Sequence, residues 1–297
     1  MKVKAHLLEH LIGMSSSIVS GAFLLVLLFF VDQLGITISK SFLVIEWSKM
    51  VLIYTIPLLA LKTNIIYVED IERRVGVISL RRMLVVLTTV VYFFCIQSTY
   101  EPQRVVLEIL LVSKLIDIVI EERYLLTAAS GKVLEGYLFS LLGNILRLAL
   151  VLFLVFHPNY HILVLILFCG ILLLYSLQIR VRHISLVNKP VITALVAVIV
   201  TTYMSAYMVN VLRVNLARFD SDFVDDFGVL LSLGGIFGVV YNVAWQRSYF
   251  KGNIVVSSLL KEICLFTVLL LLGTVVLGPL VLRNFFDSVD ILVNNAS

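Results

Sequence analysis

The sequence predicts an all-α membrane protein whose helices cross the bilayer several times. Hydrophobic residues make up 61% of the 297 residues and charged residues only 14%, and the mean hydropathy is +1.07. Soluble domains carry about 25% charged residues. A soluble protein of this composition would have too few polar side chains to face water. The composition therefore excludes ordinary soluble enzymes and binding modules.

Nine apolar stretches approach the roughly 20 residues that a helix needs to cross a bilayer core. They are residues 11–31, 41–61, 83–98, 105–121, 134–156, 161–179, 190–212, 226–245 and 260–282. Trp47 and Tyr100 are two of several aromatic residues near span ends, where they fit anchoring at the membrane interface. The longest connection, residues 62–82, is too short for a separate domain, so the function is expected within or between the helices.

Local signals mark where several spans begin and end. The first span follows a short N-terminal segment without a small-residue cleavage site, which favours a retained helix over a signal peptide. The third and fourth spans are short or interrupted by polar residues. Pro190 after Asn188 is a normal start for the seventh helix. Acidic residues from Asp220 to Asp226 precede the eighth helix, where they favour its dipole. The polar stretch from Arg283 onward follows the ninth span.

The positions of lysine and arginine predict the orientation. With the N-terminus inside, 15 of the 23 Lys and Arg residues fall in inner segments, counting Lys261 at the inner end of the ninth span, and five fall in outer segments. Inner loops are enriched in these residues, so the split predicts a cytoplasmic N-terminus. Nine spans then place the C-terminus outside.

Lys114, Asp117 and Glu121 are charged residues within or at the end of the fourth span. Their spacing of three and four places them on one helix face. A charge at mid-bilayer depth costs about 2.5–3.5 kcal/mol on insertion scales, so such residues usually face a bundle interior or a wet cavity. The stripe is either a self-neutralising pair with a solvated Glu121, or a cavity wall that binds an anion or relays protons.

Three further sets of polar residues are candidates for the same cavity. Glu46 and Lys49 lie one turn apart on the second span, where Lys49 either snorkels or faces the cavity. Arg147, mid-way along the fifth span, either pairs with Asp117 or Glu121 or offers its guanidinium to a phosphate. Asn210 and Arg213 share a face at the end of the seventh span, which is otherwise an ordinary cation-capped helix end.

Enzymatic chemistry finds little support in the sequence. There is no G-x-S-x-G, H-E-x-x-H or P-loop motif. The three cysteines, Cys95, Cys169 and Cys264, are far apart and form no ligand spacing with histidine. We therefore expect no enzyme activity, no metal and no cofactor, and we do not expect nucleic acid as a partner.

Three blocks resemble the oligosaccharide and O-antigen flippases of the multidrug/oligosaccharidyl-lipid/polysaccharide exporter superfamily. The first is the basic stretch from Leu61 to Arg82. The second runs from Leu111 through Lys114, Asp117 and Glu121 and continues over 142–147 to Arg147. The third comprises 205–213, with Asn210 and Arg213, and 227–246. The resemblance is spread over most of the chain in the family's order.

The resemblance implies an inner-membrane protein that moves a polyprenyl-diphosphate-linked oligosaccharide from the inner to the outer leaflet by alternating access. For that function we expect substrate contacts from Lys49, Lys114, Arg147, Asn210 and Arg213, which would line a wet cavity and bind the diphosphate. We expect ion coupling through Asp117, Glu121 and Glu46. Other membrane proteins of polysaccharide or lipopolysaccharide assembly are implied partners.

The family usually has two six-helix lobes. Nine spans therefore predict a six-helix lobe at 1–182 and a partial lobe of three helices with a polar tail at 183–297. Two alternatives stay open: a membrane-embedded glycan polymerase or acyltransferase, which short outer loops disfavour, and a small-solute exporter of the same fold, which the cationic residues disfavour.

Overall fold

A computed structural model describes five helices and part of the N-terminal segment. The described residues are 40–55, 71–99, 101–157 and 160–181, with scattered positions between 12 and 27 and at 196, 200 and 204. Over this part of the chain the protein is all-helical and contains no strand. The predicted spans at 226–245 and 260–282, and nearly all of the span at 190–212, lie outside the described residues.

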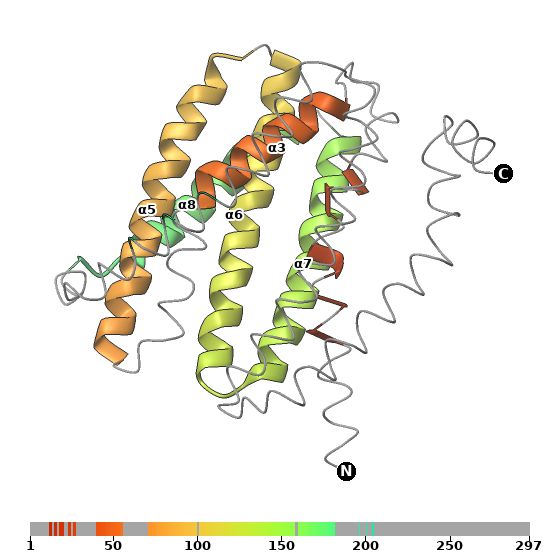
Figure 1. The fold of residues 1–297 in the computed structure, drawn as a ribbon. Helices are drawn as coiled ribbons and strands as arrows, with labels where there is room; N and C mark the ends of the chain where they lie inside the picture. Colours follow the sequence, from red (N-terminus) through yellow and green to blue (C-terminus); the bar gives the residue numbers. More distant parts are fainter. Residues whose placement is uncertain are drawn as a thin grey trace.

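The five helices form a bundle in which α6 is central (Figure 1). They are α3 (Lys40–Thr55), α5 (Ile71–Gln97), α6 (Glu101–Ala129), α7 (Val133–Phe156) and α8 (His161–Leu177). Helix α6 packs against each of the other four, most extensively against α7. The charged fourth span predicted from the sequence is therefore a helix enclosed by other helices rather than one at the edge.

A tight turn joins α6 to α7 and makes the two helices antiparallel neighbours. Gly131 occupies the left-handed region with φ of 84°, and Lys132 N donates to Thr127 O at 3.1 Å. Such a glycine satisfies carbonyls at the end of a helix at little steric cost. The turn matches the connection expected between residues 121 and 134.

Close approach of α6 and α7 depends on glycines along their contact. A Cβ atom placed on Gly143 would lie 2.8 Å from Ile120 Cγ1, and one on Gly136 would lie 3.1 Å from the Tyr124 ring. Small residues at such positions allow helix backbones to pack closely. Gly13, in the N-terminal segment, similarly lies against the Tyr137 ring of α7.

Helix α5 begins at Ile71, twelve residues before the start predicted for the third span. The sequence indicated a basic loop because Arg81 and Arg82 interrupt the apolar pattern. In the structure both arginines point toward carboxylates of α6: Arg81 Nη2 lies 2.7 Å from Glu121 Oε2, and Arg82 Nε donates to Glu122 Oε1 at 2.8 Å. These partners neutralise the charges and allow the helix to continue through them.

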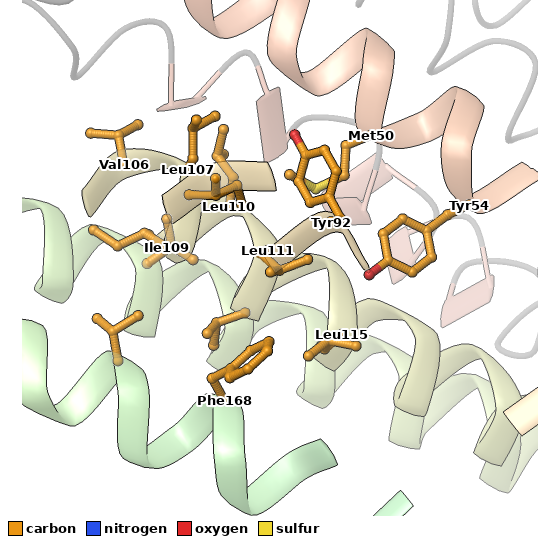
Figure 2. Close-up of a cluster of buried hydrophobic side chains, with 14 of the residues drawn as sticks. Met50, Tyr54, Tyr92, Val106, Leu107, Ile109, Leu110, Leu111, Leu115 and Phe168 are labelled. Atoms are coloured by element: carbon orange, nitrogen blue, oxygen red, sulfur yellow. The ribbon is translucent and has the colours of Figure 1, made fainter. Parts of the chain in front are cut away.

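An apolar core fills the space between α3, α5, α6 and α8. Figure 2 shows Met50 and Tyr54 of α3, Tyr92 of α5, and Phe168 of α8 around a run of leucines on α6. Tyr54 and Thr89 join their hydroxyls at 2.6 Å within this layer. The hydroxyl pair satisfies polar groups that would be costly to bury alone.

Many large apolar side chains lie on the outer surface of the bundle, while several charged residues are buried inside it. Large apolar side chains are exposed on α5, α7 and α8, among them Phe94, Leu146 and Leu174, whereas Arg81 and Arg147 are almost fully buried. Soluble proteins rarely expose such continuous apolar surface. The distribution is consistent with a membrane protein.

Two of the described helices are long and apolar enough to cross a membrane. They are Arg74–Gln97, with 24 residues, and Val133–Leu154, with 22. At 1.5 Å per residue the shorter one is about 33 Å long, against a hydrocarbon core of about 30 Å. Helix α8 contributes a shorter apolar segment, Ile162–Leu177.

Candidate functional site: a buried charge cluster on α6 and α7

Asp117 lies between two cations at the interface of α6 and α7. Lys114 Nζ, one turn earlier on α6, donates to Asp117 Oδ2 at 2.8 Å. Arg147 Nη1 of α7 forms an ion pair with the other carboxylate oxygen, Asp117 Oδ1. The antiparallel packing of α6 against α7 brings Arg147, thirty residues away in sequence, to this carboxylate.

Two aromatic rings from other helices cover the cations. The Arg147 guanidinium lies 4.6 Å from the centre of the Phe23 ring, and Lys114 Nζ lies 5.7 Å from the centre of the Trp47 ring. The centres of the Phe23 and Trp47 rings are themselves 5.2 Å apart. Cations over ring faces are stabilised by the ring quadrupole. We call these five residues the Asp117 cluster; α3, α6, α7 and the N-terminal segment contribute to it.

The Asp117 cluster is enclosed and carries an excess of positive charge. Side-chain exposure is 2% for Arg147, 11% for Lys114 and 24% for Asp117. Two cations face one carboxylate, so the cluster has one net positive charge. In this setting a buried guanidinium provides strong, directional hydrogen bonds to carboxylate or phosphate oxygens.

Unused hydrogen-bonding capacity lies beside the ion pairs. Arg147 Nε and Asn144 Oδ1, one turn earlier on α7, are buried and have no hydrogen-bond partner among the described residues. Buried polar groups without a partner are rare and point to water, an ion or a ligand. The cluster can therefore accept additional polar atoms without first breaking its ion pairs.

A short row of polar side chains continues from the cluster along α7. Ser140 Oγ accepts from Ser16 Oγ at 2.8 Å and from Asn144 Nδ2 at 3.4 Å. The row links Arg147 to the N-terminal segment by polar side chains one turn apart. Such a row suits ordered water between helices.

The structure separates Glu121 from the other charges of its stripe. Glu121 pairs with Arg81 of α5, while Asp117 pairs with Arg147. Of the two carboxylates that the sequence offered as partners for Arg147, the structure selects Asp117. Glu121 is therefore not simply solvated, because it pairs with Arg81, whose side chain is fully buried.

The remaining predicted site residues are placed differently. Lys49 Nζ lies 2.5 Å from Glu46 Oε1 within α3, and the Lys49 side chain is 48% exposed. This pair is local to its helix; Trp47, between the two residues, is the part of this segment that reaches the cluster. Asn210 and Arg213 lie outside the described residues.

Sequence reasoning missed a second polar network, which joins α5, α6 and α8. Glu122 accepts hydrogen bonds from Arg82 Nε and Nη2 and from the Tyr175 hydroxyl. Arg82 also donates to the carbonyl oxygen of Gln178 at 2.9 Å. Consecutive arginines at 81–82 facing consecutive glutamates at 121–122 were a signal that could have indicated this pairing. The aromatic cover from Phe23 had no comparable signal.

Within the described residues, His, Cys, Asp and Glu side chains form no group of three that could hold a metal ion. Comparison of the chain with protein-family models, with curated proteins and with solved structures finds no match in any of the three. The case for a function therefore depends on the residues and their geometry.

Proposed function

We propose that the chain is a membrane transporter that moves a polyprenyl-diphosphate-linked oligosaccharide from the inner to the outer leaflet. The Asp117 cluster would form part of its substrate and coupling site. The observation that carries this proposal is the enclosed arrangement of Lys114 and Arg147 around one carboxylate, inside a bundle that exposes many large apolar side chains. The resemblance of three sequence blocks to oligosaccharide flippases gives the substrate class.

The chemistry of the cluster suits a diphosphate. A diphosphate and its sugars cannot cross hydrocarbon unaided, because their hydration would be lost without replacement. Lys114 and Arg147 replace hydration with charge-assisted hydrogen bonds, and the unpartnered Arg147 Nε is a ready donor. The prenyl chain remains in lipid while the head group passes between the helices.

Asp117 makes substrate binding dependent on a second ion. While ionised, it competes with the diphosphate for both cations. The two neighbouring cations favour the ionised form, so Asp117 takes up a proton only as the diphosphate draws Lys114 and Arg147 to itself, and that proton then strengthens binding of the anion. Proton movement and substrate movement are thereby coupled, and the alternating-access cycle can be driven by a proton gradient. Glu46, Lys49, Glu121, Asn210 and Arg213 remain predicted contributors to the same pathway.

Flipping of a fluorescent lipid-linked glycan in proteoliposomes tests the proposal. The variant Lys114→Gln/Arg147→Gln removes both cations and keeps side chains of similar size. Two lost charge-assisted contacts predict a fall in rate of about tenfold or more. Lys132→Gln is the matched control, since Lys132 is an exposed cation whose partner Glu135 is also exposed.

Equal rates for wild type and a well-folded Lys114→Gln/Arg147→Gln protein would remove these residues from the site. Asp117→Asn tests the coupling separately. Its transport should lose dependence on an imposed pH gradient, whereas wild-type transport should keep it.

A further inference from the structure

A pocket of about 300 Å³ lies at one end of the bundle, apart from the Asp117 cluster. It is formed mainly by α6 and α8, with one residue each from α5 and α7. The lining residues that matter here are Arg82, Glu122, Arg123, Phe139, Leu174 and Tyr175. Glu122 and Arg123 lie near the end of α6, and Phe139 lies near the start of α7. The pocket therefore lies about two helical turns from the α6–α7 turn.

One wall of the pocket is polar and largely self-satisfied. Glu122 binds both Arg82 and Tyr175 through its carboxylate, and the Arg82 guanidinium lies 5.5 Å from the centre of the Tyr175 ring. These three groups use most of their hydrogen-bonding capacity on one another. Together, the Arg82 and Glu122 charges cancel, so these residues form a neutral part of the pocket lining.

Arg123 differs from its neighbours because it is exposed and has no carboxylate partner among the described residues. The two arginines and one glutamate that line the pocket leave one net positive charge. The lining also contains apolar side chains: Phe139 and Leu174 are both exposed. An exposed cation and exposed apolar side chains in one pocket complement an amphipathic anion.

We propose that this pocket binds an anionic phospholipid, with the phosphate at Arg123 and the first methylene groups against Phe139 and Leu174. Basic pockets between helices on the cytoplasmic side suit anionic head groups. Ligand pockets begin at about 300 Å³, so this one fits a head group and the upper part of a chain while the rest stays in the bilayer. The inference depends on the proposed membrane location and not on transport.

Native mass spectrometry of the purified protein with phosphatidylglycerol or phosphatidylethanolamine tests the proposal. Wild type should retain phosphatidylglycerol preferentially. Arg123→Gln should lower that retention about fivefold, the effect of one cation near a lipid surface. Lys132→Gln, which removes an exposed cation of the α6–α7 turn that does not line the pocket, should leave retention unchanged.

Two additional arms identify the ligand. Phe139→Ala should weaken phosphatidylglycerol retention, because the lipid chain loses an apolar contact. Inorganic phosphate should fail to compete at millimolar concentration. Competition by phosphate with no effect of Phe139→Ala would show a soluble-anion site and overturn the lipid assignment, as would equal retention of the two lipids. Failure of membrane insertion itself, measured by alkaline extraction, would instead defeat the proposed function.

Discussion

At the scale of single residues, Asp117 has the most consequential position in the described structure. It neutralises Lys114 from its own helix and Arg147 from α7, while Phe23 and Trp47 cover the two cations. A carboxylate shared by two enclosed cations cannot be removed without leaving a charge unpaired. The same property makes it suitable for switching cation availability during transport.

Replacing Asp117 by Asn should therefore destabilise the protein. Removing one member of a buried ion pair costs about 3–5 kcal/mol, because the remaining charge stays buried. Thermal unfolding in detergent should show a clear fall in midpoint for Asp117→Asn. Asp117→Asn/Arg147→Met should recover part of it; a double variant as unstable as the sum of the two single variants would contradict the pairing.

At the scale of elements, α6 is held by charges toward α5 and α8 and by close packing toward α7. The Arg81–Glu121 and Arg82–Glu122 pairs join α5 to α6, and Tyr175 adds α8 through Glu122. Gly136 and Gly143 bring α6 and α7 together. The ion pairs and the glycine contacts each lead to a separate testable prediction.

Glu122→Gln should weaken the attachment of α5 and α8. The change leaves Arg82 without its carboxylate in a half-buried site, and a loss of stability of about 3 kcal/mol is expected. Glu135→Gln is the control, since its exposed pair with Lys132 contributes at most about 1 kcal/mol. Similar unfolding midpoints for the two variants would mean that the Glu122 network does not hold the helices.

Gly143→Ala should destabilise the contact between α6 and α7. The added Cβ would lie 2.8 Å from Ile120 Cγ1, and overpacking of this kind costs about 1–3 kcal/mol. Gly170→Ala on α8 is the matched control, because no described residue beyond its own stretch of helix has an atom within 4 Å of the added Cβ. Ile120→Ala should rescue Gly143→Ala; absence of rescue would argue against this steric explanation.

At the scale of the whole molecule, the exposed apolar side chains and the buried charges make a lipid bilayer a far more favourable environment than water. Cys169 lies on α8, which presents exposed apolar side chains such as Ile166 and Leu173. In a bilayer this thiol would face hydrocarbon. In water it would be open to any reagent.

Cys169, kept as the sole cysteine in a Cys95→Ala/Cys264→Ala background, should resist a charged methanethiosulfonate reagent in intact membranes. Such reagents stay in water and do not reach a thiol that faces hydrocarbon. Labelling should become complete after denaturation in detergent. Rapid labelling in native membranes would place α8 in water and contradict the membrane assignment.

The predicted orientation has its own test at the α6–α7 turn. Ser130 is exposed there, and a cytoplasmic N-terminus places the turn inside. Ser130→Cys in a cysteine-free chain should label in inverted vesicles and not in intact cells. The reverse pattern would invert the topology.

Some features of the fold could be predicted from the sequence, and others required the tertiary structure. The helical class and the helices near 134–156 and 161–179 could be predicted, because a long apolar run is visible in the local sequence. The structure has helices at both places. The start of α5 could not, because Arg81 and Arg82 read as loop residues until their partners on α6 are known. Orientation, substrate class, the number of membrane crossings and the last three spans remain predictions.

By itself the sequence determined that charged residues sit in apolar helices, and that Lys114 and Asp117 share a face, because helix periodicity is a local property. Only the tertiary structure decided that Arg147 pairs with Asp117 rather than Glu121, and that Phe23 and Trp47 cover the cations. These contacts join residues from separate helices. Their choice depends on how α6 packs against its neighbours, which no local pattern encodes.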